Sequence, residues 1–121
     1  IDIAQIEKHP LRTCDEDISF LRSKGVIVQA YSPLCKMNPK IRENEILEAL
    51  SKKYKRNVGS IIMRWHIDTG VVPVFTSKKS SRILEYADIF NFSLEEKDII
   101  AVNAINENYK MYLESWLCPG Y

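Results

Sequence analysis

A short hydrophobic stretch, residues 26–34 (V-I-V-Q-A-Y-S-P-L), constrains the fold of this chain more than any other. Three β-branched residues open it and Gln29 is the one polar residue before Ser32, so both faces of the predicted strand are apolar. Strands of this kind are buried on both sides, as in parallel sheets. Pro33 has no N–H to donate, so the strand should end there with Tyr31 at its carboxyl end. Ligands bind at that end of α/β sheets; a structural tyrosine capping a core strand is the alternative.

The order of the predicted elements indicates an α/β fold. Strands are predicted at residues 1–7, 26–31 and 71–75, helices at 14–24, 45–54, 58–68, 80–89 and from 93 onward, a loop at 35–40, and a non-helical aromatic tail from 106. Strands that alternate with helices favour right-handed crossovers and a parallel sheet. Three parallel strands are too few to close a barrel and leave two unpaired edges, so this chain needs partner strands.

Helical spacing predicts the start and the buried side of each helix. Asn57 is a candidate cap for the helix at 58–68, and Ser93-Leu94-Glu95-Glu96 has the pattern of a capping box. The side chains expected to face inward are Ile46, Leu47, Leu50 and Tyr54, then Val58, Ile61, Ile62 and Trp65, then Ile83, Leu84 and Ala87, and finally Ile99, Ile100, Val102 and Ala104.

Length and composition exclude several classes of partner. The chain has 121 residues and a net charge of +1, enough for one domain and too little charge for nucleic acid or an anionic membrane. No apolar run approaches the roughly 20 residues that span a bilayer. Cys14, Cys35 and Cys118 are odd in number and far apart, which favours reduced thiols in the cytoplasm, and no zinc spacing is present. The strand-like start without methionine indicates a piece of a longer protein.

Polar side chains follow each predicted strand, and in a parallel sheet they meet on one face. Three cations and two hydroxyls at residues 78–82 open a helix, which favours an anion such as a phosphate ester, with a solvated helix cap as the alternative. A tyrosine ring beside such a site suggests a nucleotide cofactor, although no glycine fingerprint or phosphate loop is present. The residues at the strand ends are Gln5 and Glu7, then Tyr31, Ser32 and Leu34, then Thr76 and Ser77.

The two histidines are predicted to be structural. His9 precedes Pro10 and His66 follows Trp65, and neither has an evident carboxylate or metal partner in the sequence. Isolated histidines of this kind are seldom catalytic. No Ser-His-Asp or Cys-His pairing is evident either.

A set of short motifs, in order along the chain, resembles the carboxyl-terminal part of an aldo-keto reductase. The similarity runs from residue 1 to about residue 108, and Q-I-E-x-H-P and A-Y-S-P-L are specific in combination. The matching pieces are Gln5-Ile6-Glu7 with His9-Pro10, Ser23-Lys24-Gly25-Val26, Ala30-Tyr31-Ser32-Pro33-Leu34, Arg64-Trp65-His66, and Ser77 with Arg82-Ile83.

The resemblance implies a partial (β/α)₈ TIM barrel. Residues 1–105 would form its last three βα units and residues 106–121 its C-terminal loop. Members of the family reduce aldehydes and ketones, or oxidise alcohols, by hydride transfer with NADPH or NADH. The partners implied are a small carbonyl substrate and the remaining strands of the barrel, from the parent protein or another chain.

The resemblance also assigns site residues. Gln5 would bind the nicotinamide carboxamide, Tyr31 would stack on its ring, and Trp116 in the tail would border the substrate. The other cofactor-binding residues implied are Ser32 and Leu34 at the pyrophosphate, and Thr76, Ser77, Arg82 and Glu85 at the adenosine end.

Departures from the family pattern leave two questions open. The lysine that usually holds the 2′-phosphate is absent beside Ser77, whereas Arg82 remains and Lys78 or Lys79 is a candidate replacement, so NADPH and NADH both stay possible with NADPH favoured. The family's catalytic Asp, Tyr, Lys and His lie upstream of this chain, which should therefore be inactive alone and contain no catalytic residue. The alternatives are a non-catalytic nicotinamide-binding regulatory protein, resembling the potassium-channel β subunits, and a stand-alone three-layer α/β domain.

Overall fold

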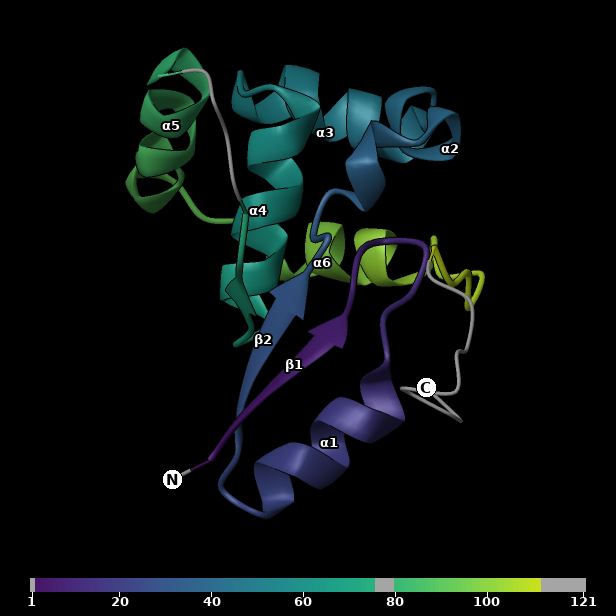
Figure 1. Cartoon of the computed structure of the whole chain (residues 1–121). Helices are drawn as coiled ribbons and strands as arrows, with labels where there is room; N and C mark the ends of the chain where they lie inside the picture. Colours follow the sequence, from purple (N-terminus) through teal and green to yellow (C-terminus); the bar gives the residue numbers. More distant parts are fainter. Residues whose placement is uncertain (1, 76–79, 112–121) are drawn as a thin grey trace.

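The computed structural model describes residues 2–75 and 80–111, with the side chains of residues 80–82 excluded. Its three strands form one parallel sheet in the order β1-β2-β3 (Figure 1). The elements are β1 (Ile3–Glu7), α1 (Asp15–Ser23), β2 (Ile27–Tyr31), the 3₁₀ turn η1 (Cys35–Met37), α2 (Pro39–Arg42), α3 (Glu45–Tyr54), α4 (Val58–Asp68), β3 (Val72–Pro73), α5 (Ser80–Ala87), the 3₁₀ turn η2 (Asp88–Asn91) and α6 (Glu96–Asn103).

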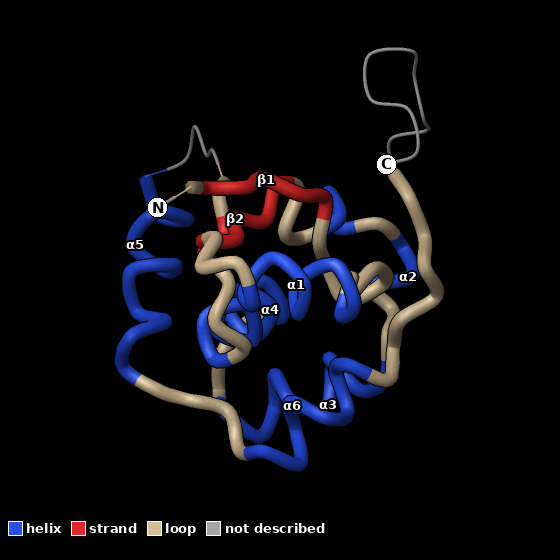
Figure 2. Tube along the Cα trace, turned by 90° about the horizontal axis from the view of Figure 1, so that it is seen from below, coloured by secondary structure: helices blue, strands red, loops and turns tan. Residues whose placement is uncertain are grey.

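Helices cover one face of the sheet. Figure 2 shows β1 and β2 on one side of the molecule, α1 and α4 next to them, and α3 and α6 farther away. Ile6, Val28 and Ala30 point toward the helices and are at most 5% exposed, in a cluster with Ile18 of α1. Side chains alternate along a strand, so the other face is the one that carries Ile27, which is 44% exposed. The described residues therefore leave that face of the sheet largely uncovered.

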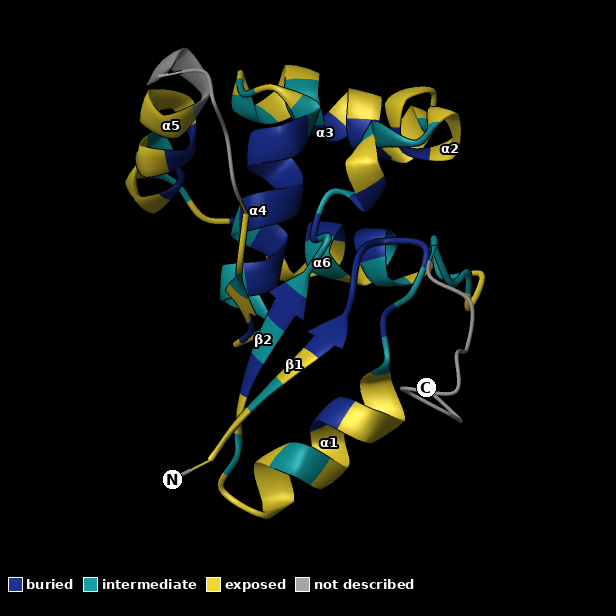
Figure 3. Cartoon of the chain, in the orientation of Figure 1, coloured by how far each residue is buried: buried dark blue, intermediate teal, exposed yellow. Residues whose placement is uncertain are grey.

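The main core surrounds α4. Ile61, Ile62 and Trp65 are fully buried, and they pack with Leu47 of α3 and Val102 of α6. Figure 3 shows α4 as the most continuously buried helix. The predicted inward face of this helix is confirmed. Its apolar residues recur at helical spacing, and burying them against α3 and α6 is favourable by roughly 25 cal/mol per Å² of apolar surface.

The predicted ends of α3 and α4 are also confirmed. Asn57 accepts a hydrogen bond from the backbone N–H of Ser60 at 2.8 Å, and Asn44 accepts one from Leu47 at 3.0 Å. These side chains satisfy donors that the first turn of a helix leaves unpaired. Gly70, with φ of 77°, follows α4 in a backbone conformation that side-chain-bearing residues rarely adopt.

Three predicted local elements differ from the structure. The expected loop at residues 35–40 contains η1 and the start of α2. Asn38 caps α2 by accepting a hydrogen bond from Lys40 N, and Pro39 stands in the first turn. The predicted capping box is wrong: α6 begins at Glu96, its N-cap residue is Glu95, and no side chain caps it. The third strand spans two residues rather than residues 71–75.

The predicted inward face of α5 is wrong. Leu84 is 73% exposed and Ile83 is 51% exposed, whereas Tyr86 and Ile89 are buried. Tyr86 packs where α4 has Gly59: a Cβ at that glycine would lie 3.2 Å from the tyrosine hydroxyl. Leu84 faces solvent, whereas Ile83 is partly exposed beside the apolar cavity next to β3. Four further side chains expected to face inward are exposed as well: Ile46 and Ile100, at 38% and 60%, together with Ala87 and Ala104.

No helix within the described parts of the chain is both long and apolar enough to cross a membrane.

Lys55, which follows α3, offers a test of backbone strain. It is exposed and has φ of 56°, a left-handed conformation that favours glycine. We expect Lys55→Gly to raise the free energy of unfolding by about 0.5–1 kcal/mol. Urea denaturation followed by circular dichroism measures the change. Lys52→Gly, inside the same helix, is the matched control and should lower stability by about 1 kcal/mol; equal signs for the two variants would contradict the interpretation.

Candidate functional site

Two pairs of polar side chains lie across β1 and β2 on the face of the sheet that carries Ile27, where Gln5 is exposed and Glu7 is buried. Gln5 stands opposite Gln29 and Glu7 stands opposite Tyr31 in the parallel register. Gln5 Nε2 donates to Gln29 Oε1 at 3.0 Å, and Gln5 itself is exposed. Because residues two apart on a strand share a face, the amides and the Tyr31 ring belong to one surface. The structure thus places Gln5 and Tyr31, the two residues expected at the nicotinamide, on the same face of the sheet.

The segment after β2 turns sharply at Ser32. Its φ is 48°, and its carbonyl accepts a hydrogen bond from Cys35 N at 2.9 Å. Pro33 is buried and its carbonyl accepts from His66 Nε2 at 3.1 Å, which ties this turn to α4. Ser32 and Leu34 are both half-buried directly beyond the carboxyl end of β2. This is the position in the sheet at which the sequence predicted them.

The expected adenosine-binding residues are only partly described. Glu85 is exposed on α5, and its Oε2 accepts from Asn57 Nδ2 at 3.0 Å. That bond joins α5 to the first turn of α4. Thr76, Ser77 and Trp116 lie outside the described residues, as does the side chain of Arg82.

A pairing that the sequence interpretation missed lies at the end of β1. His9 Nε2 lies 2.8 Å from Glu7 Oε2, and both side chains are at most 2% exposed. The expectation that His9 has no carboxylate partner is therefore wrong. Burial lowers the pKa of His9, opposed by the hydrogen bond to Glu7, so a neutral ring donates its Nε2–H to the carboxylate near pH 7. The spacing E-x-H in an extended chain was the available signal, because it places both side chains on one side.

Lys8 lies on the opposite side of the strand and is 2% exposed. Its Nζ donates to the carbonyl of Thr13 at 2.8 Å and lies 4.2 Å from the centre of the Trp65 ring. Burial lowers the pKa of this ammonium to about 8. The ring face and the carbonyl compensate part of the cost of removing the charge from water.

A tyrosine–lysine–aspartate cluster occurs among the helices, away from the sheet. Tyr54 and Lys53 both donate to Asp98 Oδ2. Burial and the hydrogen bond to Asp98 raise the pKa of Tyr54, whereas a proton donor to a carbonyl needs a lowered pKa. The Tyr54 hydroxyl also accepts from Glu95 N at 2.9 Å, at the start of α6. This cluster therefore joins α3 to α6.

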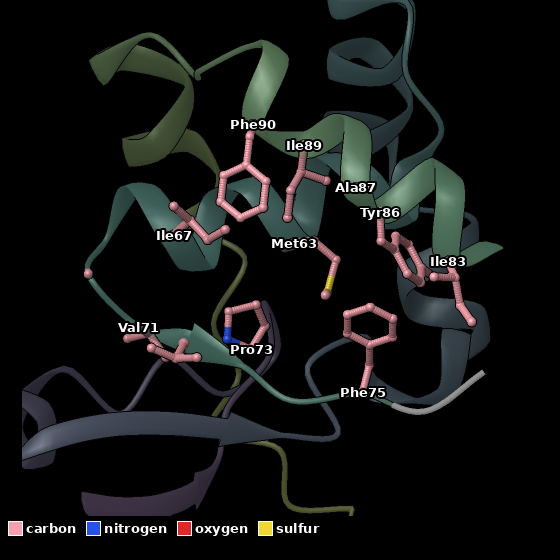
Figure 4. Close-up of a pocket in the computed structure, with 12 residues that line it drawn as sticks. Met63, Ile67, Val71, Pro73, Phe75, Ile83, Tyr86, Ala87, Ile89 and Phe90 are labelled. Carbon is pink, nitrogen blue, oxygen red and sulfur yellow. The ribbon is translucent and has the colours of Figure 1, made fainter.

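An apolar cavity of about 670 Å³ lies beside β3, between α4 and α5 (Figure 4). It has no charged lining residue, and none of Gln5, Tyr31, Ser32 or Leu34 lines it. The residues expected to bind a cofactor therefore lie outside this cavity. The lining residues are Met63, Ile67, Gly70, Val71, Val72, Pro73, Phe75, Ile83, Tyr86, Ala87, Ile89 and Phe90.

The polar residues of the uncovered face fit a nicotinamide group by their chemistry. The Gln5 amide contains both a donor and an acceptor, as a carboxamide does, and the Tyr31 ring is half-buried on the same surface. Within residues 2–75 and 80–111, no group of three or more His, Cys, Asp or Glu side chains could hold a metal ion.

The parallel sheet, the helical crossovers and the polar surface at the strand ends define an α/β protein of the barrel class, present as three βα units of an unclosed TIM barrel. The Aldo/keto reductase family model matches residues 1–107. The chain belongs to the aldo-keto reductase family. The resemblance and the fold class expected from the sequence are thus confirmed.

Relatives from bacteria and insects show the extent of the match. Glyoxal reductase of Bacillus subtilis is 34% identical over 109 residues, which are 90% of this chain and 39% of the relative. The Bombyx mori aldo-keto reductase solved in complex with NADP superposes with a TM-score of 0.88 at 32% identity, covering 98% of this chain and 42% of that structure. An aldo-keto reductase from a deep-sea metagenome gives a TM-score of 0.89 at 25% identity, covering 93% and 42%. This chain spans about two fifths of the length of these proteins.

Proposed function

We propose that this chain is the cofactor-binding part of an NAD(P)H-dependent aldo-keto reductase that interconverts aldehydes or ketones and alcohols. The observation that supports this most directly is the placement of Gln5 and Tyr31 on adjacent strands of the uncovered sheet face. The cofactor would supply the hydride that adds to the carbonyl carbon of the substrate. The Gln5 amide would hold the carboxamide, and the Tyr31 ring would support the nicotinamide plane.

The rest of the cofactor would follow the carboxyl ends of the strands. Ser32 and Leu34, beyond β2, would lie along the pyrophosphate. The adenosine end would be held by Thr76, Ser77, Arg82 and Glu85. NADPH is the favoured cofactor, because the Bombyx mori relative was solved with NADP and Arg82 offers a cation for a 2′-phosphate.

The remainder of the barrel is the proposed partner for the exposed edges of this chain. Residues 1–105 would be the last three βα units, and residues 106–121 a tail that borders a small carbonyl substrate through Trp116. The outer edges of β1 and β3 have no partner strand among the described residues. The apolar side chains that line the cavity beside β3 would pack against a neighbouring βα unit. The proton donor would come from that missing part, so the chain alone would be inactive. The odd number and wide spacing of the cysteines favour a cytoplasmic location, and within residues 2–75 and 80–111 Cys14 and Cys35 form no disulfide.

Titration of NADPH and NADH against the folded chain by calorimetry tests the cofactor site. Tyr31→Ala should weaken binding by about 1 kcal/mol, roughly fivefold, because a ring contact is lost. Tyr31→Phe is the matched control and should bind as the unmodified chain does. Lack of binding of either cofactor by a folded sample would overturn the proposal, and equal affinities of the alanine and phenylalanine variants would make the tyrosine structural only.

A non-catalytic nicotinamide-binding regulatory protein would use the same cofactor site. Tyr54 does not distinguish the two functions, because it lies among the helices, away from the sheet, and joins α3 to α6. Turnover of an aldehyde by the intact protein decides between the two: measurable oxidation of NADPH supports the reductase, and cofactor binding without turnover supports the regulator.

A further inference from the structure

The segment that follows α6 is held against the loop after β1 by backbone hydrogen bonds. The N–H groups of Glu107 and Tyr109 both donate to the carbonyl of Leu11, at 3.0 and 2.9 Å. The N–H of Met111 donates to the side chain of Glu7, at 2.9 Å. Every second residue from 107 to 111 thus uses its N–H to contact residues 7–11.

The loop that receives these bonds is itself closed by backbone hydrogen bonds. His9 and Arg12 exchange two backbone hydrogen bonds, of 3.1 and 2.8 Å, and so close a tight turn around Pro10. Leu11 is 1% exposed, and its side chain belongs to the main core together with the half-buried Tyr109. The tail is therefore attached to a loop that is fixed by the core.

Glu7 is the polar centre of this attachment. Its Oε2 accepts hydrogen bonds from both His9 Nε2 and Met111 N, and the carboxylate is 2% exposed. Hydrogen bonds to an ionised acceptor are about twice as strong as neutral ones. Loss of the carboxylate would leave a buried ring N–H and a backbone N–H without this acceptor, which is unfavourable for both groups.

The attachment lies beside the residue proposed to support the nicotinamide. Glu7 stands opposite Tyr31 in the register, one pair beyond Gln5 and Gln29 on the same face of the sheet. We propose that Glu7 and His9 are positioning residues that anchor residues 107–111 at the carboxyl end of β1, beside Tyr31, and so help to shape the substrate side of the proposed cofactor site. The anchor depends on the contacts described above, whereas its role toward a substrate rests on the proposed function.

The outer contacts of the same tail provide a matched control. Lys40 and Glu107 form an ion pair of 2.9 Å whose side chains are 56% and 48% exposed. An exposed ion pair of this kind contributes little to stability, because water screens both charges. Glu107→Gln should therefore leave the tail in place, while Glu7→Ala should release it.

Hydrogen–deuterium exchange of the full chain measures the anchor without any cofactor. In Glu7→Ala the amides of residues 107–111 should exchange at least about tenfold faster, with those of α3 unchanged, because one charge-assisted bond is worth more than 1.4 kcal/mol. Met111→Pro removes the N–H that donates to Glu7 and keeps the Glu7–His9 pair. This variant therefore tests the anchor even if Glu7→Ala fails to fold. Unchanged protection of Glu107 and Tyr109 in Met111→Pro would overturn the anchor.

Kinetics of the intact protein measure the role of the anchor toward substrate. Met111→Pro should leave the affinity for NADPH within about twofold and raise KM for an aldehyde about tenfold, with kcat changed much less. An unchanged KM with a released tail would refute the positioning role. Absence of NADPH binding in the unmodified protein would instead refute the proposed function, and the exchange result would still stand.

Discussion

Replacement of Trp65 by alanine is expected to lower the free energy of unfolding by about 4 kcal/mol, the range found when a buried tryptophan is truncated. Its ring is fully buried in the core around α4. It also lies beneath the ammonium of Lys8 and donates its Nε1–H to Asn103 at 2.9 Å. The alanine variant would leave a cavity and a buried cation without the ring. Urea denaturation followed by circular dichroism measures the loss.

Two variants show whether the effect belongs to this site. Trp65→Phe keeps a ring beneath Lys8 and loses the bond to Asn103, so its cost should be about 1–2 kcal/mol. Leu84→Ala removes an aliphatic side chain that is 73% exposed and should change stability by less than about 0.5 kcal/mol. A loss below 2 kcal/mol for Trp65→Ala would contradict the packing described for α4.

Acidification from pH 7 to pH 5 should destabilise the chain by about 2 kcal/mol through His66 alone. Burial lowers the pKa of this imidazole from 6.5 to about 3, and the hydrogen bond to Pro33 opposes the shift only in part. Below pH 6.5 the unfolded state therefore binds a proton that the folded state does not. Stability is full above that pH and falls as the pH drops toward 3. The Nδ1 atom of His66 has no hydrogen-bond partner among the described residues, so protonation would bury an unpaired N–H.

The variant His66→Gln separates this contribution from the others. Its amide can still donate to the Pro33 carbonyl but does not titrate, so the loss between pH 7 and pH 5 should shrink by about 2 kcal/mol. His9 should leave a smaller slope of the same sign, because burial lowers its pKa as well. The lowered pKa of Asp98 acts below this range: burial alone would raise it, but the hydrogen bonds from Lys53 and Tyr54 outweigh that effect. Identical pH slopes for both proteins would rule out His66 as the cause.

Local patterns in the sequence were sufficient for the helices at the centre of the fold. The limits of α3 and α4 are those predicted, because their apolar residues recur at helical spacing and Asn44 and Asn57 cap them. The same reasoning failed at α5 and α6. In α5 the buried side includes Tyr86, which packs beside Gly59 of α4. Directly before α6, the N–H of Leu94 donates to Asp68. Both contacts join residues more than 25 positions apart.

The sequence by itself determined the order of strands and helices, the end of β2 at Tyr31 and the motifs shared with aldo-keto reductases. All of these follow from residue type and spacing over a few positions. Only the tertiary structure decided that Glu7 binds His9 and Met111, and that the Lys8 ammonium lies over the Trp65 ring. Met111 is 104 residues from Glu7, and no local pattern specifies which buried donor meets which acceptor at that separation. Those contacts are fixed by the packing of the sheet, its connecting loops and the tail against one another.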